Sequence, residues 1–483
     1  MRTAKKDITE EKEKGRIYTP EYIVNAILNF SGYKGNCILK RHAIDNSCGD
    51  GAFLKKIVKR YCEEAVRANY SSDELKNDLQ TYIHGIEIDN DEQKSCISNL
   101  NNIIKEYKLQ DIEWDVLCGD ALTEDKYNRK MDFVLGNPPY VRVHNLGNAF
   151  DEIKKFSFSQ GGMTDLFIVF YEVGLRMLKP SGTLGYITPN SVFNSLAGKH
   201  MRSVLMQNNL LDKVIDLKHY QAFNATAYTA ILILRKNKNN SDVEYYEFDE
   251  EKLSPKYVER LKADDYYIAG NFYFSKKENL KTMKKIQSNF CKCDIEVKNG
   301  YATLCDDVFV NDFEFESPYI IPAVKSSKGQ RKKILFPYDK ECRLIPEEEL
   351  KKDKNVYKYL SANKEKLLKR SNEKDSKTFW YAFGRSQAIS DTYRDKVAIN
   401  SLIRNKDDFK FTEAPAGTGV YGGLYIISDT IPAKQILEAL KSDEFINYIA
   451  LIGKYKSGGY YTYSSKDVKA YLDYKFNHDG GIL

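Results

Sequence analysis

The sequence lacks several features that would place it in a known class at once. It has no apolar run of about 18 or more residues, the length that a membrane-spanning helix needs. Residues 1–14 are charged where a signal peptide has an apolar core. No Gly-x-x-x-x-Gly-Lys motif is present, so a P-loop phosphate site is not expected. We therefore expect a cytoplasmic protein without a membrane partner.

The cysteines show no metal-binding pattern. The nine cysteines are scattered, and no pair of Cys-x-x-Cys units occurs at zinc spacing. Cys291 and Cys293 lie two residues apart, but a partner pair at the usual spacing is missing. We expect reduced structural thiols and no metal cofactor.

The bulk composition is that of a globular protein with more than one domain. The chain has 483 residues, which is too long for one ordinary hydrophobic core, and two domains are the simplest expectation. Its 42% hydrophobic and 29% charged residues predict a well-packed fold. The formal charge of +6 permits nucleic-acid binding without demanding it.

The first half of the chain alternates short apolar runs with helical patterns. This alternation is typical of an α/β fold built around a doubly wound, mainly parallel sheet. The expected strands are residues 43–45, 83–88, 115–117, 133–135, 184–187, 214–216 and 230–234, and expected helices include 52–64, 91–107 and 166–177. The polar stretch 236–242 (KNKNNSD) predicts a boundary between domains 1–241 and 242–483. The second half mixes basic clusters, glycine pairs and aromatic residues without this alternation.

Three acidic groups follow successive predicted strands. Asp45 opens a glycine turn, DNSCGDG, whose glycines let the backbone approach a ligand. Glu87 ends the next strand, where a carboxylate can accept hydrogen bonds from ribose hydroxyls. Asp120 follows the third strand and could accept one from an adenine amino group. Each carboxylate alone could be a helix cap, but the set indicates a nucleoside site.

The strongest chemical signal is Asn137-Pro138-Pro139-Tyr140, which follows an apolar strand. Two prolines lack backbone N–H groups and restrict the loop, so carbonyl oxygens can point into a site. The Asn137 side-chain oxygen and the Pro138 carbonyl can accept both protons of an aromatic amine and hold it for an incoming methyl group. Tyr140 offers a face on which a planar base can stack.

At this point the chain resembles the gamma class of N6-adenine DNA methyltransferases, the Taq-type family of restriction-modification systems. The resemblance covers the first half closely and the second half more loosely. It rests on Tyr18-Thr19-Pro20 before a helix from Glu21, Asp45 to Gly51, Glu87, Asp120, Asn137 to Tyr140, Asp165-Leu166-Phe167, residues 180–184 and Phe223, and then on residues 299–309, 380–387 and 458–461. Asp45 departs from the several members that carry glutamate there, which leaves its contact with the cofactor open.

The resemblance implies a class I S-adenosylmethionine-dependent methyltransferase fold, followed by an α+β target-recognition domain. The implied reaction flips an adenine out of double-stranded DNA and yields N6-methyladenine and S-adenosyl-L-homocysteine. The implied catalytic residues are Asn137, Pro138, Pro139, Tyr140 and Phe223. The implied cofactor residues are Tyr18, Thr19, Pro20, Asp45, Ser47, Cys48, Gly49, Gly51, Glu87, Ile88, Asp120, Ala121, Asn137 and Pro139.

The second domain would hold the DNA, and the protein is expected to be a monomer. Basic residues there can contact phosphates, and a smaller set can read bases. The DNA-facing candidates are Lys325, Lys328, Arg331, Lys332, Lys333, Arg385 and Gln387. A charge run is equally often a solvated face, and Arg385 and Gln387 could equally be internal structure.

Three other hypotheses remain open. The same loop could methylate an RNA base or a protein glutamine, although the large second half argues against the glutamine enzymes. A non-catalytic DNA-binding homologue is a second alternative, and the intact loop speaks against it. A fused nuclease is a third, for which Glu296-x-Lys298 is the only fragment, and a structural role is preferred there. The sequence does not say whether a companion restriction endonuclease exists or whether the enzyme is an orphan methylase.

Overall fold

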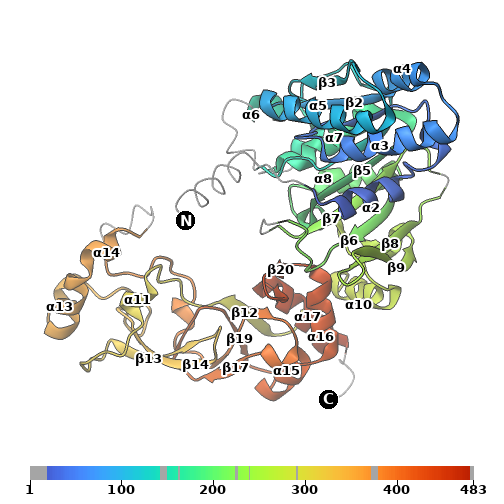
Figure 1. Cartoon of the computed structure of the whole chain (residues 1–483). Helices are drawn as coiled ribbons and strands as arrows, with labels where there is room; N and C mark the ends of the chain where they lie inside the picture. The colour runs from blue at the N-terminus through green and yellow to red at the C-terminus, as the bar shows by residue number, and fades with distance from the viewer. Residues whose placement is uncertain are drawn as a thin grey trace. The chain divides into compact units, whose positions relative to one another are not determined.

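The chain folds into two compact units, Met1–Lys281 and Thr282–Leu483 (Figure 1). The computed structural model describes residues 19–141, 150–160, 164–223, 227–238, 240–289, 292–370 and 379–478. In that part of the chain no helix is both long and apolar enough to cross a membrane.

The first unit is built on one nine-stranded sheet with the order β3-β2-β1-β4-β5-β7-β6-β8-β9. The five strands from β3 to β5 are parallel, and β7 runs antiparallel to both of its neighbours. The strands are β1 (Ala43–Asp45), β2 (Ile83–Glu87), β3 (Asp115–Cys118), β4 (Met131–Gly136), β5 (Leu178–Pro189), β6 (Leu211–Asp216), β7 (Thr229–Arg235), β8 (Val243–Asp249) and β9 (Ser254–Leu261). All seven predicted strands are present, and most of them have buried apolar cores.

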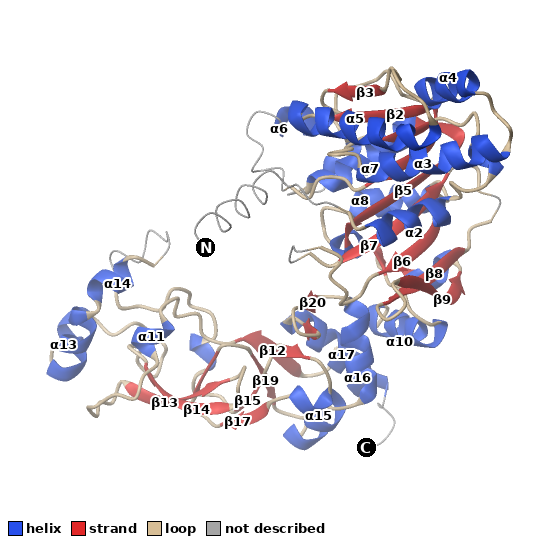
Figure 2. Cartoon of the chain, in the orientation of Figure 1, coloured by secondary structure: helices blue, strands red, loops and turns tan. Residues whose placement is uncertain are grey.

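Helices cover both faces of this sheet, as Figure 2 shows. Helices α2, α3 and α5 share one buried core on one face, and α7 packs on β4 and β5. The helices of this unit are α2 (Glu21–Ser31), α3 (Ala52–Arg67), α4 (Ser72–Tyr82), α5 (Asn90–Ile104), α6 (Phe150–Ile153), α7 (Leu166–Met177), α8 (Lys199–Gln207), α9 (Ala263–Tyr266) and α10 (Lys277–Gln287), of which α10 crosses the division between the units. The predicted doubly wound α/β architecture is therefore confirmed.

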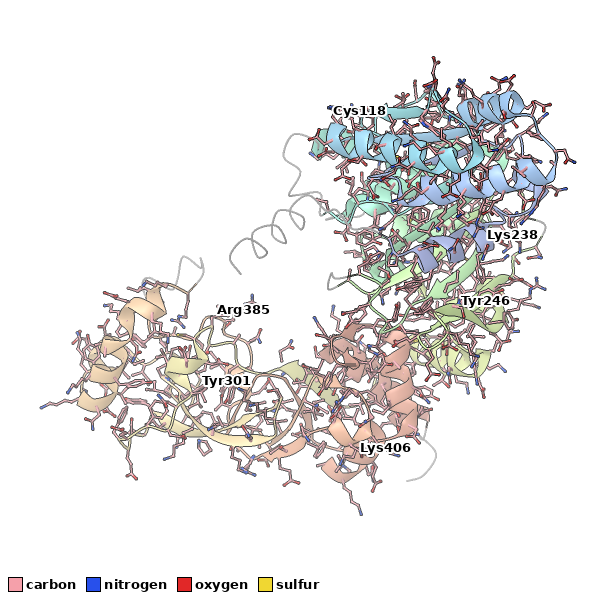
Figure 3. All side chains as sticks on the ribbon, in the orientation of Figure 1. Cys118, Lys238, Tyr246, Tyr301, Arg385 and Lys406 are labelled. Carbon is pink, nitrogen blue, oxygen red and sulfur yellow. The ribbon has the colours of Figure 1, made fainter. Side chains whose placement is uncertain are left out.

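The structure corrects the predicted domain boundary at residue 241. Strand β8 pairs in parallel with β6, and β9 pairs with β8, so the sheet continues past that point. The stretch 236–242 is polar but not a free linker: the Lys238 ammonium is buried and donates to the carbonyls of Leu211 and Asp242 (Figure 3). The first unit therefore ends at Lys281.

A buried arginine fastens the end of this unit to its core. The Arg202 side chain on α8 is 1% exposed and donates to the carbonyls of Val192 and Ser195. It also donates to the Gly270 carbonyl and the Asn271 side chain, which belong to the hairpin of β10 (Tyr267–Ile268) and β11 (Asn271–Phe272). A buried guanidinium is tolerable because acceptors surround it.

The second unit is α+β, as predicted, with three small sheets ordered β12-β19-β15-β17, β14-β13-β18 and β16-β21-β20. Its strands are β12 (Ile295–Asn299), β13 (Ile320–Lys325), β14 (Gln330–Leu335), β15 (Lys396–Ile399), β16 (Leu402–Ile403), β17 (Phe411–Ala414), β18 (Gly419–Tyr421), β19 (Leu424–Ser428), β20 (Tyr455–Lys456) and β21 (Tyr460–Thr462). Its helices are α11 (Asp306–Phe309), α12 (Glu347–Leu350), α13 (Lys354–Ala362), α14 (Lys364–Leu368), α15 (Ala433–Leu440), α16 (Asp443–Ile452) and α17 (Ser465–His478). An aromatic core that includes Tyr301, Phe336 and Phe383 holds the part around β13 and β14 together.

Candidate active site

The turn after β1 is a tight glycine loop at the carboxyl edge of the sheet. Gly49 and Gly51 have φ angles of +52° and +91°, a region that favours glycine. A Cβ atom at Gly51 would lie 2.8 Å from the Cys96 sulfur on α5, so only glycine fits there without movement. Cys48, in the same turn, is buried, and Ser47 is half-buried. The loop is therefore packed closely against α5.

Glu87 at the end of β2 organises this loop. One carboxylate oxygen accepts the Gly49 N–H at 2.8 Å, and the other accepts the Asp89 N–H at 2.9 Å. The next side chain, Ile88, is 70% exposed, which is unusual for a large apolar residue. Asp120 follows β3 and caps the Leu122 N–H, with Ala121 buried beside it. The structure thus gathers the predicted acidic residues at one edge, with an exposed apolar surface among them.

The loop 137–140 leaves β4 at the same edge and is held by two side chains. The Asn137 side-chain nitrogen donates to the Thr19 hydroxyl oxygen at 3.1 Å. The Ser47 hydroxyl donates to the Asn137 main-chain carbonyl at 3.3 Å. Pro138 is buried and Pro139 is half-buried. The predicted cofactor loop and the predicted catalytic loop are therefore in direct contact.

Tyr140 and Phe223 come from distant parts of the sequence and meet here. Their rings are 6.3 Å apart in an edge-to-face arrangement at 78°, and Phe167 contacts Tyr140 with the same geometry. The Tyr140 hydroxyl donates to the Ile187 carbonyl on β5 at 3.1 Å, which fixes the ring. Burial raises the pKa of Tyr140, so its hydroxyl stays a neutral donor. The two predicted aromatic residues thus form one aromatic wall at this edge.

Asp45 is a buried carboxyl group next to the end of β4. It is 1% exposed, its Oδ1 accepts the Ser47 N–H at 3.1 Å, and a Cβ atom at Gly136 would lie 2.6 Å from that oxygen. Burial raises the pKa of Asp45 to about 8; the Ser47 N–H lowers it, and the Glu87 charge raises it further. Among the described residues no cation pairs with Asp45, which is therefore mainly protonated at neutral pH.

This pKa predicts a specific pH dependence of stability. An unfolded aspartate has a pKa near ~3.9, so between roughly pH 4 and pH 8 the folded state binds a proton that the unfolded state releases. The free energy of unfolding therefore falls as pH rises through this window, by up to about 1.4 kcal/mol per pH unit from this group. Asp45→Asn cannot ionise and should lack this contribution.

The measurement is the melting temperature of both proteins, without ligands, at pH 5 and pH 8. We expect the melting temperature of Asp45→Asn, relative to that of the wild type, to be higher at pH 8 than at pH 5. Other titrating groups cancel in the difference between the two proteins. An equal difference at both pH values would mean that Asp45 is ionised throughout.

Comparison with known proteins finds a family match for the segment that carries this edge. Residues 36–223 match the family described as Eco57I restriction-modification methylase. The predicted resemblance to restriction-modification methylases is confirmed at that level. The sheet order and this match also confirm the class I S-adenosylmethionine-dependent methyltransferase fold.

Similar proteins extend beyond the matched segment. The Type II methyltransferase M.BstVI of Geobacillus stearothermophilus is 25% identical over 76% of this chain and 73% of its own length. The restriction enzyme and methyltransferase RM.Eco57I of Escherichia coli is 23% identical over 92% of this chain, which spans 55% of that protein. The structure of the Type IIL restriction-modification enzyme MmeI in complex with DNA is similar, with a TM-score of 0.64 at 15% sequence identity. The match covers 92% of this chain and 63% of the MmeI chain.

In the second unit, the basic candidates gather on one hairpin. Strands β13 and β14 pair antiparallel, with Ala323 opposite Lys332 and Lys325 opposite Gln330. Lys328 lies in the connecting turn, and Lys333 lies on β14; both are exposed. Lys332 is 4.0 Å from the Asp312 carboxylate, and Arg331 donates to the Glu413 carbonyl at 3.3 Å.

The other two DNA-facing candidates lie on the loop after Gly384. Arg385 is exposed, and its side chain extends away from the body of this unit (Figure 3). The Gln387 side chain is exposed but donates to the Gly300 carbonyl at 2.8 Å. The Arg385 side chain is therefore available for a ligand, whereas the Gln387 amide also makes a hydrogen bond within the unit.

Some residues that the sequence singled out lie outside the described part of the chain, and others have structural contacts. Tyr18 and Cys291 lie outside the described residues, and Cys293 contacts the Asp473 carboxylate. Lys298 bridges the carboxylates of Glu296 and Asp391 at 2.5 and 2.8 Å. The hydrogen bond from Lys298 lowers the pKa of Glu296 most, and the hydrogen bond from Arg394 lowers it further. The Glu296-x-Lys298 fragment thus belongs to an ion-pair network of the chain itself, which favours its structural interpretation.

The sequence did not indicate three residues, Tyr22, Tyr220 and Phe248, that support the aromatic wall. The hydroxyl groups of Tyr22 and Tyr220 lie 2.5 Å apart, and the Tyr220 ring stacks on Phe248 at 4.7 Å. Tyr22 follows the Tyr-Thr-Pro motif and Tyr220 precedes Phe223. Their closeness to those residues is the only signal that the sequence contains.

Proposed function

We propose that this protein is a gamma-class, Taq-type DNA methyltransferase. In the proposed reaction it transfers a methyl group from S-adenosyl-L-methionine to the N6 amino group of an adenine flipped out of double-stranded DNA. One observation carries the proposal: the Asn137 loop leaves β4 in contact with Ser47 and Thr19, and its Tyr140 ring contacts Phe223. This arrangement combines acceptors for an amino group with aromatic surfaces for a base.

The chain's own residues account for the proposed chemistry. The Asn137 side-chain oxygen and the Pro138 carbonyl would accept the two protons of the adenine amine, which orients its nitrogen toward the methyl donor. The Tyr140 ring, fixed through its hydroxyl group to Ile187, would stack on the base. Together with Phe223 it would replace part of the stacking that the base loses on flipping, which costs about a few kcal/mol.

The residues at the edge fit S-adenosylmethionine. The Glu87 carboxylate is half-buried at the end of β2, where it could accept ribose hydroxyls, and Ile88 offers the exposed apolar surface that an adenine ring needs. Asp45 is a buried carboxyl group that a cationic ligand would favour in its ionised form. Gly49 and Gly51 would allow close approach to the amino-acid end. When bound, the cofactor supplies the electrophilic methyl group.

A methyl-transfer assay tests this proposal against its rivals. Tritium-labelled S-adenosylmethionine is offered with duplex DNA, structured RNA or a release factor, and DNA from cells expressing the protein is sequenced for modified adenines. We expect label in DNA as N6-methyladenine within one short sequence. Label in RNA or in glutamine would establish the corresponding rival, and DNA binding without turnover would establish a non-catalytic homologue.

The name of RM.Eco57I covers both restriction and methylation, and for this chain we propose the methylation. A companion restriction endonuclease would recognise the same sequence, and the modification site found by sequencing would identify its target. Incubating unmodified plasmid with the protein and magnesium tests whether this chain also cleaves DNA. We expect the plasmid to stay intact.

We further propose that the β13–β14 hairpin contacts DNA phosphates. Lys328 and Lys333 are exposed and have no ion pair among the residues that the structure describes, so alanine at both positions should leave the fold intact. Each phosphate contact that is lost should reduce the slope of log Kd against log salt concentration by about 0.9. We therefore expect the double variant to lower the slope by about 1.8, measured by fluorescence anisotropy.

The matched control is the double replacement of Lys434 and Lys441 by alanine, which changes the net charge equally. Both lysines are exposed, at the start and just after the end of α15. The control should keep the wild-type slope if the hairpin contacts the DNA. Equal slopes for the two double variants would show that only the overall charge matters.

A further inference from the structure

The segment that leads into α2 contacts two separate parts of the candidate active site. Thr19 accepts the hydrogen bond from the Asn137 side chain, and it is 8% exposed. Three residues later, the Tyr22 hydroxyl lies 2.5 Å from the Tyr220 hydroxyl, on the loop that carries Phe223. Thr19 and Tyr22 therefore reach the catalytic asparagine and the aromatic loop from one short piece of chain.

This piece of chain begins a firmly packed helix. The Pro20 carbonyl accepts the N–H groups of Ile23 and Val24, which starts the first turn of α2. Ile23, Ile27 and Leu28 are fully buried, and α2 packs against β4, β5 and β7. The helix end is thus fixed to the strands from which the active-site loops emerge.

The contact with Thr19 determines how the Asn137 amide is turned. An amide has a donating nitrogen and an accepting oxygen, which leave the same carbon in different directions. Because the nitrogen donates to Thr19, the oxygen is directed away from Thr19. Ser47 holds the main-chain carbonyl of the same residue. An acceptor that is already oriented costs no reorganisation when the amine arrives.

The contact with Tyr22 fixes the part of the loop that precedes Phe223. Tyr220 is held from two sides, by the Tyr22 hydroxyl and by the Phe248 ring, which stacks on it at 27°. Lys218 has a φ angle of +51°, its N–H donates to Asp216, and its ammonium lies 3.2 Å from the Glu247 carboxylate. Strand β8, which carries Glu247 and Phe248, therefore supports the aromatic wall although it lies beyond the predicted catalytic domain.

We propose that Thr19 and Tyr22 are positioning residues that hold the Asn137 amide and the Phe223 loop in the geometry that receives the extruded base. This inference rests on the proposed function and assigns Thr19 a role in base positioning beyond the predicted contact with the cofactor. Tyr22 acts through Tyr220 and touches no reacting atom. Loss of either contact leaves the site assembled but its two walls less well aligned.

The test for Thr19 compares valine with serine, because valine keeps the shape and serine keeps the hydroxyl group. With the recognition sequence identified, we expect Thr19→Val to lower kcat at saturating S-adenosylmethionine by about three- to tenfold, the effect of one lost hydrogen bond, and Thr19→Ser to restore it. The dissociation constant of the cofactor should change by less than this factor. A weaker cofactor affinity with unchanged kcat would overturn the proposal, since Thr19 would then serve only the cofactor.

The test for Tyr22 is a double-mutant cycle with Tyr220. Tyr22→Phe and Tyr220→Phe each remove one hydroxyl of the same pair, so each should lower kcat by about three- to tenfold and the double variant no further. In cofactor-free complexes, 2-aminopurine at the target adenine should lose part of its fluorescence gain in these variants, at unchanged DNA affinity and melting temperature. Additive losses, or wild-type fluorescence and kcat, would overturn the proposal. Absence of N6-methyladenine from the wild-type reaction would instead contradict the proposed function.

Discussion

Replacing Asn137 with alanine is expected to lower kcat for adenine methylation by about two to three orders of magnitude, the usual cost of losing one preorganised polar group at a reacting centre. The affinities for S-adenosylmethionine and for DNA should stay close to those of the wild type. The reason is that the Asn137 side-chain oxygen would accept a proton of the reacting amine, whereas its nitrogen donates to Thr19 within the chain.

Single-turnover methylation with a duplex that contains the mapped site measures this effect. Ser47→Ala is the matched control, since it removes the bond to the main-chain carbonyl of the same residue and leaves the side chain in place. We expect its loss to be about tenfold or less. If Asn137→Ala retains a third of the wild-type rate, the amine is held by other groups and the proposed role of Asn137 is wrong.

Replacing Gly51 with alanine is expected to remove cofactor binding and to destabilise the first unit. The φ angle of +91° strains any side chain there, by roughly 1–2 kcal/mol. The new Cβ would also meet the buried Cys96 sulfur at 2.8 Å, and overpacking of this kind costs about 1–3 kcal/mol more. To relieve the clash, the loop must move away from α5 and so displace the Gly49 N–H from Glu87.

Gly32→Ala separates the two contributions. Gly32 ends α2 with a φ angle of +83°, but a Cβ atom there meets nothing within 4 Å. This control should show only the backbone strain, as a modest fall in melting temperature with unchanged cofactor affinity. Isothermal titration with S-adenosyl-L-homocysteine measures the affinity, and we expect a loss of more than tenfold for Gly51→Ala alone. Equal affinities in the two variants would show that the loop tolerates a side chain at Gly51.

The strands of the first unit could be predicted because each is a short apolar run followed by a polar residue that the ligand edge needs. Asp45, Glu87 and Asn137 all stand at such ends. In a parallel sheet these ends share one edge, so the sequence order alone indicates that the residues meet. Phe223 was predictable only through the family resemblance, since the sheet order that brings it to Tyr140 is not visible in its own segment.

The domain boundary was not predictable from the same signals. A run of lysine and asparagine is typical of a linker, but lysine can bury its aliphatic stem and place its ammonium on carbonyl groups. Lys236 donates to the carbonyls of Leu175 and Leu178, and Lys238 does the same at Leu211. Tyr22 and Tyr220 escaped prediction for a related reason, because an aromatic residue beside a motif is usually ordinary core.

The Arg202 anchor and the two added strands determine how the first unit can be produced alone. A fragment that ends at Ser241 would lose β8 and β9, expose the edge of β6, and remove two of the acceptors that surround the Arg202 guanidinium. Unpaired sheet edges promote aggregation, and a buried charge without acceptors is costly. A fragment that continues through α10 keeps the hairpin at Gly270 and the aromatic residues that follow it. The shorter fragment would therefore be expected to accumulate as insoluble material even though it contains every residue of the catalytic motif.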